Sequence, residues 1–162
     1  MINKINYIDV GARGNLTDPW FYHENELNVF GFEADPNECK RLQEKYPNRK
    51  YFNFALSSKK GMLNIYLTKN LAQSSIYPPN EKNIQFEKQH WDTRQTKSKI
   101  EVKCSTIDDS LVKNNVDAIK IDTQGSEYEI LKGGVNTLIK QKPILFFGDM
   151  VPSRLLRSAT YA

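Results

Sequence analysis

Cysteine is scarce in this sequence of 162 residues, and long hydrophobic runs are absent. The two cysteines, Cys39 and Cys104, are far apart and lack C-x-x-C spacing, which argues against a disulfide framework or a zinc site. We expect both thiols to be buried and reduced. No apolar run approaches the roughly 18 residues of a membrane-spanning helix, and the amino terminus has no charged-then-apolar export segment. We therefore predict a cytoplasmic protein without a membrane partner.

A concentrated charge of one sign is also missing. The net charge is +4, but the lysines are scattered, and only residues 97–103 and the Lys40-Arg41 pair are locally dense. No aromatic residues are interleaved with them as in a nucleic-acid groove, so solvent-exposed faces explain them better and no nucleic-acid partner is predicted. Apolar residues make up 39% and charged residues 26%, which is typical of a globular chain whose length suits one domain.

Strand-like and helix-like patterns alternate along the chain. Five apolar segments are predicted as buried strands, at residues 7–10, 29–35, 50–56, 117–122 and 143–147. Helices are predicted at 36–46 and at 126–134, where Ser126 and Glu129 have capping-box spacing. Strands separated by single helices imply a doubly wound α/β fold with a mostly parallel sheet, which binds ligands at the carboxyl ends of its strands.

Two further segments, 62–68 and 100–107, alternate like half-exposed strands. We expect them to pair as an antiparallel hairpin around the long polar connection 69–99. A loop of this length is typical either of a functional element or of a disordered excursion, and the sequence favours neither.

A glycine turn follows the first predicted strand, in the stretch YIDVGARGN at residues 7–15. Small residues let the backbone approach a ligand closely, and we expect the amides to face an anionic group at the start of a following helix. Asp9, just before the turn, would meet a cation, which suits a ligand with an ammonium group better than a pyrophosphate. The complete G-x-G-x-x-G of dinucleotide sites is lacking.

Acids close the second predicted strand. Glu33 lies 22 residues after Gly11 (33 − 11), close to the ~20 residues expected for an acid that binds ribose hydroxyls. A carboxylate accepts hydrogen bonds from two neighbouring hydroxyls at once. The residues therefore indicate a nucleoside-containing cofactor, either a dinucleotide or S-adenosylmethionine.

Five segments together resemble the FkbM family of class I S-adenosylmethionine-dependent methyltransferases. They are IDVGARG at 8–14, FEADP at 32–36, NFALSSKKG at 53–61, TIDD at 106–109 and IKIDTQGSEYEILKGG at 119–134. The last is the most specific, because IKID-x-QG-x-E followed by LKG is characteristic of that family. The resemblance spans residues 7–147. It implies a Rossmann-like fold, S-adenosylmethionine as cofactor, and methyl transfer to a hydroxyl of a saccharide or a glycosylated metabolite.

The resemblance also implies roles for individual residues. Asp9, Gly11, Ala12 and Gly14 would form the turn around the methionine part of the cofactor. Glu33 would hold the ribose hydroxyls, with Ala34 and Asp35 beside the adenosine. Asn53, Ala55 and Leu56 would flank the adenine, and Ser74 and Ser75 match a short serine element in the family's variable loop.

Two features depart from the family. Its usual turn is DVGAN-x-G, whereas Arg13 stands here at the asparagine position and Asn15 at the last glycine position. We expect Gly14 to supply the flexibility and Arg13 to pair with the cofactor carboxylate. The family's sheet normally has seven strands, but residues 148–162 show no strand alternation. We therefore predict a shortened methyltransferase domain at 1–147, an irregular or divergent tail at 148–162, and an uncovered sheet edge that favours either oligomers or instability.

Two acids are candidates for the chemistry. Asp122 ends the fourth buried strand and would lie near the reacting methyl, and Glu127 opens the helix that follows. Either is a candidate base for a hydroxyl acceptor, and both together are candidate ligands of a divalent metal, although no metal-ligand motif is present. The alternative is that neither acid takes part in the chemistry: Glu127 would only favour the start of the helix, and Asp122 would only contact the cofactor.

The long connection offers further candidates. His90 is a second candidate base, and Phe86 and Trp91 either cover an acceptor or anchor the loop. Two other functions stay open at this point: an NAD-dependent oxidoreductase, supported by the position of Glu33, and a non-catalytic remnant of a methyltransferase fold, supported by the short carboxyl end.

Overall fold

A computed structural model of the chain describes residues 4–80, 91–111 and 115–148. Its centre is a five-stranded parallel sheet in the order β3-β2-β1-β7-β8. The strands are β1 (Ile5–Val10), β2 (Leu27–Phe32), β3 (Lys50–Phe52), β7 (Ala118–Ile121) and β8 (Ile144–Phe147). Parallel strands need crossover connections, and the sheet confirms the predicted Rossmann-like α/β fold.

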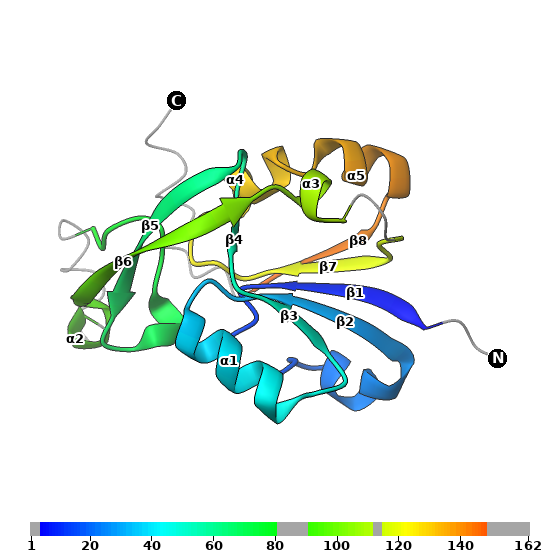
Figure 1. Cartoon of the computed structure of the whole chain (residues 1–162), viewed down its shortest axis with the longest axis horizontal. Coiled ribbons are helices and arrows are strands. Elements are labelled where there is room, and N and C mark those ends of the chain that lie inside the picture. Colours follow the sequence, from blue (N-terminus) through cyan, green and yellow to red (C-terminus); the bar gives the residue numbers. More distant parts are fainter. Residues whose placement is uncertain (1–3, 81–90, 112–114, 149–162) are drawn as a thin grey trace.

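Helices lie on both faces of this sheet (Figure 1). One side carries α1 (Pro36–Lys45), and the other carries α3 (Ile107–Leu111), α4 (Glu127–Lys132) and α5 (Val135–Gln141). The short 3-10 helix η1 (Trp20–Glu26) occupies the connection from β1 to β2. No helix of the described ranges is long and apolar enough to cross a membrane.

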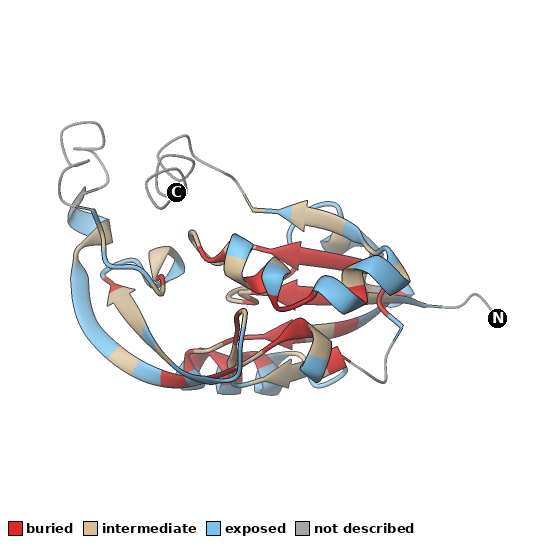
Figure 2. Ribbon diagram, turned by 90° about the horizontal axis from the view of Figure 1, so that it is seen from above, coloured by how far each residue is buried: buried red, intermediate tan, exposed pale blue. Residues whose placement is uncertain are grey.

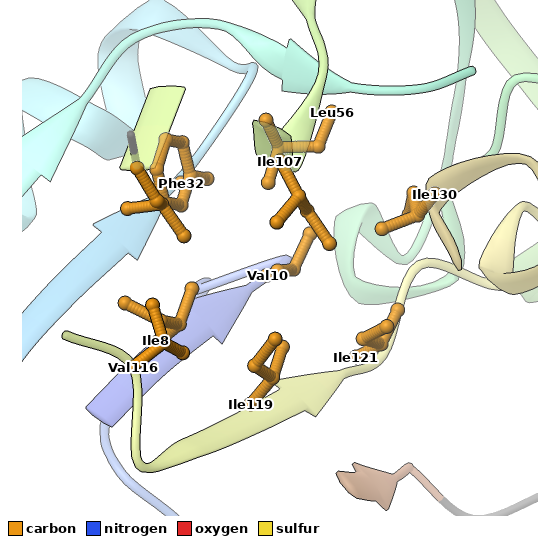
Figure 3. Close-up of a cluster of buried hydrophobic side chains, with 10 residues drawn as sticks. Ile8, Val10, Phe32, Leu56, Ile107, Val116, Ile119, Ile121 and Ile130 are labelled. Carbon is orange, nitrogen blue, oxygen red and sulfur yellow. The ribbon is translucent and has the colours of Figure 1, made fainter. Parts of the chain in front are cut away.

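Successive residues of the central strands face opposite sides of the sheet, which gives the protein two hydrophobic clusters. Ile8 and Val10 of β1 and Ile119 and Ile121 of β7 are all buried in the larger cluster (Figure 3). Tyr7 and Ala118, which are their neighbours in sequence, belong to the cluster on the other face. The innermost strands are therefore buried on both sides, as Figure 2 shows by their colour.

A second sheet has three strands in the order β4-β6-β5. The strands β5 (Gly61–Thr68) and β6 (Thr96–Ser105) pair antiparallel, which confirms the predicted hairpin. This pair, which we call the β5–β6 ribbon, curves away from the central sheet in Figure 2. The long connection includes η2 (Leu71–Gln73) and α2 (Trp91–Arg94), and its residues 81–90, with Phe86 and His90, lie outside the described residues.

Three predictions of local structure were wrong. The segment predicted as one strand at 50–56 forms β3 and β4 (Ala55–Leu56), which belong to different sheets. The strand predicted at 29–35 ends at Phe32, so its acids lie in the loop before α1. The helix predicted at 126–134 ends at Lys132, and α5 begins after Gly133-Gly134. Gly133 is required there because a Cβ would meet the Ser57 carbonyl oxygen at 2.0 Å.

The predicted capping box at the start of α4 is also absent. The Ser126 hydroxyl donates to the Thr123 hydroxyl oxygen at 2.8 Å, and Glu129 accepts from Ser58 at 2.5 Å instead of returning to the helix start. Cys39 and Cys104, by contrast, are both buried and unpaired, as predicted. Within the described residues β8 pairs only with β7, while residues 149–162 of the predicted tail are outside the description.

Candidate functional site

A cleft of about 180 Å³ opens at the carboxyl ends of β1, β2 and β7. The sheet order changes direction at β1, which has β2 on one side and β7 on the other. Connections from such neighbouring strands leave toward opposite faces of the sheet, and a crevice remains between them. The strand-end residues that line it include Val10, Gly11, Phe32, Glu33, Asp122 and Thr123.

The glycine turn after β1 brings two strand ends together. Gly11 has a φ of +76°, and a Cβ there would lie 2.2 Å from the Asp122 carbonyl oxygen. Gly14 has a φ of +93° but would meet nothing within 4 Å. Position 11 therefore requires glycine for two reasons: its φ is left-handed, and a side chain there would overlap the end of β7.

No helix starts at this turn, and three of its amides donate to the protein, so the prediction that they face a ligand at a helix start was wrong for Gly11, Ala12 and Gly14. Gly11 and Ala12 donate their N–H groups to the Phe32 carbonyl at 3.0 and 3.2 Å, and Gly14 donates to Glu38 Oε1 at 3.0 Å. The chain continues through a cis Asp18-Pro19 bond into η1, and no α-helix follows β1 directly. The turn therefore uses its amides to join β1 to β2 and to α1.

An acidic cluster follows β2, at the predicted ribose position. Glu33 and Asp35 line the cleft and are both buried, and Glu33 Oε1 accepts from the Asp35 N–H at 2.8 Å. Burial raises the pKa of Glu33, while that hydrogen bond and the Arg13 charge oppose the shift. Asn53 donates to the carbonyls of Glu33 and Ala34 at 3.0 and 3.2 Å, so it fixes the loop instead of lining the cleft.

Arg13 belongs to this acidic cluster. Its Nη2 lies 2.7 Å from Asp35 Oδ2 and 4.0 Å from Glu33 Oε1, and its Nη1 lies 3.9 Å from Glu38 Oε2. Asp35 also caps α1 by accepting from the N–H groups of Asn37 and Glu38. The guanidinium expected to meet a cofactor carboxylate is thus held by three protein carboxylates.

Asp9 meets a cation of the protein itself. In the parallel register Asp9 lies beside Lys120 of β7, and its Oδ1 is 3.0 Å from the Lys120 ammonium. Lys120 also donates to the Gly11 carbonyl at 3.3 Å, and it lines the cleft, whereas Asp9 does not. Asp9 is 4% exposed, and burial raises its pKa although the Lys120 charge acts in the opposite direction. Lys120 was missed in the sequence, where it stands inside an apolar strand.

Asp122 and Glu127 lie in different surroundings. Asp122 lines the cleft, and its Oδ1 accepts from the Gln124 side-chain amide at 3.0 Å. Glu127 accepts from the N–H groups of Thr123 and Gly125, both at 3.1 Å, so it orders the loop after β7 and does not line the cleft. Within the described ranges no group of three or more His, Cys, Asp or Glu residues is arranged to hold a metal ion.

The outer wall of the cleft comes from the ribbon and the start of the long connection. Ile65 and Leu67 of β5 and Leu71 of η2 supply apolar surface. Ser74 and Ser75 also line the cleft, and the Ser75 hydroxyl donates to the Gln124 carbonyl at 2.9 Å. This hydrogen bond joins the long connection, whose Ser75 forms a bridge with Tyr66 of β5, to the loop after β7.

A small polar notch adjoins the cleft and shares Ser75 and Gln124 with it. Its other lining residues are Thr68, Gln73, Tyr77, Pro79 and Arg94. Hydroxyl, amide and guanidinium groups therefore surround the notch beside the loop that carries Asp122. Of the residues predicted to bind the cofactor, Gly11, Arg13, Glu33, Ala34, Asp35, Ala55 and Leu56 line the cleft. Asp9, Ala12, Gly14 and Asn53 are not among its lining residues.

Comparison with known proteins identifies the fold and the family of the chain. No curated protein matches the sequence. Among solved structures, the methyltransferase FkbM of Methylobacillus flagellatus KT has a TM-score of 0.59 at 16% sequence identity, covering 98% of this chain and 36% of that chain. At that identity the likeness shows the fold, and this chain spans about a third of that protein's length. The sequence matches the Methyltransferase FkbM domain over residues 9–152, which is most of the chain. The chain therefore belongs to the FkbM methyltransferase family.

Proposed function

We propose that the chain binds S-adenosylmethionine in the cleft and transfers its methyl group to a hydroxyl of a small acceptor, a saccharide or a glycosylated metabolite. The observation that carries this proposal is the position of Glu33. Its carboxylate lies at the end of β2 on the cleft, and only Oε1 accepts a hydrogen bond from the described residues. Oε2 can therefore accept from a ribose hydroxyl.

The rest of the cleft suits the two other parts of such a cofactor. Ala55, Leu56, Ile65 and Leu67 give an apolar wall against which an adenine ring would lie. Bound S-adenosylmethionine supplies a positively charged sulfonium with an electrophilic methyl group. The Asp122 carboxylate at the end of β7 favours positive charge nearby.

Asp122 is also the best-placed base in the described part of the chain. It lies on the cleft beside Gln124, whose amide holds one carboxylate oxygen and whose backbone borders the polar notch. A hydroxyl acceptor in the notch would meet both hydrogen-bond donors and hydrogen-bond acceptors, which suits a saccharide. Proton removal by a positioned carboxylate contributes about 10²–10⁴-fold to such reactions. Glu127 is not used here, because it does not line the cleft and its Oε1 orders the loop after β7 by accepting from two backbone N–H groups.

The test is a calorimetric titration of the purified chain with S-adenosylmethionine, S-adenosylhomocysteine and NAD. We expect binding of the first two and none of NAD. Glu33→Ala should weaken S-adenosylhomocysteine binding by about 10- to 100-fold, because it removes charge-assisted hydrogen bonds to the ribose. Glu101→Ala on the exposed face of β6 is the matched control and should bind as the native chain does. Binding of NAD alone, or equal affinity of both variants, would contradict the proposal.

A further inference from the structure

Lys120 is a buried ammonium group on the wall of the cleft. It is 9% exposed, and among the described residues its ammonium has two partners, Asp9 Oδ1 at 3.0 Å and the Gly11 carbonyl at 3.3 Å. An ammonium group has three N–H donors. Lys120 therefore has the capacity to donate one more hydrogen bond at the cleft that it lines.

Two cationic residues, Arg13 and Lys120, line the cleft, and they have different partners. Arg13 lies with the acids that follow β2, 2.7 Å from Asp35. Lys120 lies between the ends of β1 and β7, next to the glycine turn. Lys120 donates to the carbonyl of Gly11, in the turn that the family resemblance assigns to the amino-acid part of the cofactor, so Lys120 is the cation that this part would meet.

We propose that Lys120 binds the carboxylate of the amino-acid part of the cofactor, and that Asp9 is the positioning residue that holds the ammonium at the cleft wall. This inference rests on the proposed function. It replaces the expectation that Arg13 meets that carboxylate and that Asp9 meets the ligand's own ammonium group.

Desolvation explains why such a contact is needed. A carboxylate taken from water into a cleft loses hydration that only a paired, hydrogen-bonded charge restores. Lys120 is already desolvated and oriented by Asp9, so it loses little freedom when a ligand binds. The Asp9–Lys120 pair is overall neutral, which leaves the ammonium able to attract a second carboxylate.

The experiment compares S-adenosylhomocysteine with its decarboxylated form, which keeps the adenosine, the sulfur and the amino group. The native chain should bind S-adenosylhomocysteine about 10- to 100-fold more tightly, as expected for a hydrogen bond to a charged group. In Lys120→Met this preference should fall to about twofold or less, while the affinity for the decarboxylated form stays nearly unchanged. Both affinities are measured by calorimetry on the same protein, so a general loss of folded protein cancels in the ratio.

Removing Lys120 alone leaves Asp9 buried without its partner, so the double variant Asp9→Asn/Lys120→Met is measured as well. It should also lack the preference and should melt closer to the native temperature. Lys103→Met on the exposed side of β6 is the matched control and should keep the full preference.

The outcomes separate the two proposals. If the native chain binds both ligands equally, or if both Lys120 variants keep the preference, Lys120 does not bind the carboxylate and the proposed cofactor still stands. If Arg13→Gln abolishes the preference while Lys120→Met keeps it, Arg13 is the carboxylate partner and this inference is wrong. If the native chain binds neither ligand, the proposed function fails and this inference fails with it.

Discussion

Two glycines of one turn offer a matched test of how the cleft is built. Gly11 and Gly14 both have positive φ, +76° and +93°, so alanine at either position costs about 1–2 kcal/mol in backbone strain. At Gly14 nothing else would be affected, because a Cβ there meets no atom within 4 Å. At Gly11 the Cβ would lie 2.2 Å from the Asp122 carbonyl oxygen, about 1 Å inside the normal contact of such atoms.

That overlap is with backbone, so the end of β1 or of β7 has to move. Overpacking of this kind costs a further 1–3 kcal/mol, roughly. We expect Gly11→Ala to lower the free energy of unfolding by about 2–5 kcal/mol, against about 1–2 kcal/mol for Gly14→Ala. Because Asp122 lines the cleft, Gly11→Ala should also abolish S-adenosylhomocysteine binding in protein that is still folded, while Gly14→Ala should retain it.

Urea unfolding followed by far-ultraviolet circular dichroism measures the stability of both variants, and calorimetry measures their binding. If the two alanine variants differ by less than about 0.5 kcal/mol, the close approach of Gly11 to Asp122 is not a feature of the folded protein. Equal retention of binding would argue against the role of this turn in shaping the cleft.

Two further predictions concern stability. Asp108 accepts four hydrogen bonds from the first turn of α5. Asp108→Ala should therefore lower the free energy of unfolding, measured by urea unfolding, by about 2 kcal/mol. The exposed Glu101→Ala on β6 is the control, and an equal loss there would contradict this capping role. Hydrogen bonds from Arg41 chiefly lower the pKa of Glu38 to about 2, so the Glu38 contribution is complete above pH 4.5 and is lost as pH falls toward 2. Because Arg41 is half exposed, we expect Glu38 to contribute about 1–2 kcal/mol to the free energy of unfolding at pH 7. The difference in unfolding free energy between the native chain and Glu38→Gln should therefore become smaller between about pH 4.5 and pH 3. A difference that grows in this range would contradict the assignment.

Local sequence patterns predicted much of the central sheet. Short apolar runs that end in acids placed β1, β2 and β7, and the alternation of 62–68 and 100–107 predicted the ribbon. Local patterns failed where tertiary contacts decide the structure. The strand predicted at 50–56 is divided because the Asn53 side chain binds the loop after β2, and this contact spans 20 residues. The helices α3 and α5 were missed, and Asp108 caps α5 from 28 residues away.

The sequence likewise predicted some residues of the candidate site and missed others. Glu33, Asp35 and Asp122 are on the cleft because acids at the ends of parallel strands share one edge of the sheet. Lys120 was missed because its role depends on strand order and register, which place it beside Asp9 across 111 residues of sequence. One signal was present: a lysine inside the apolar run AIKI must be paired if that strand is buried on both faces.

The charges of the lining residues bear on which ligand the cleft selects. Three carboxylates, Glu33, Asp35 and Asp122, face two cations, Arg13 and Lys120, although the whole chain carries +4. A dinucleotide would bring a doubly charged pyrophosphate to the glycine turn, where the N–H groups of Gly11, Ala12 and Gly14 already donate to Phe32 and Glu38 and so are not available to phosphate oxygens. In the proposed binding mode a sulfonium nucleoside would bring positive charge toward Asp122 and a single carboxylate toward Lys120. These residues therefore support the proposed S-adenosylmethionine site over an NAD site, because three amides of the turn donate to the protein and the strand ends carry carboxylates.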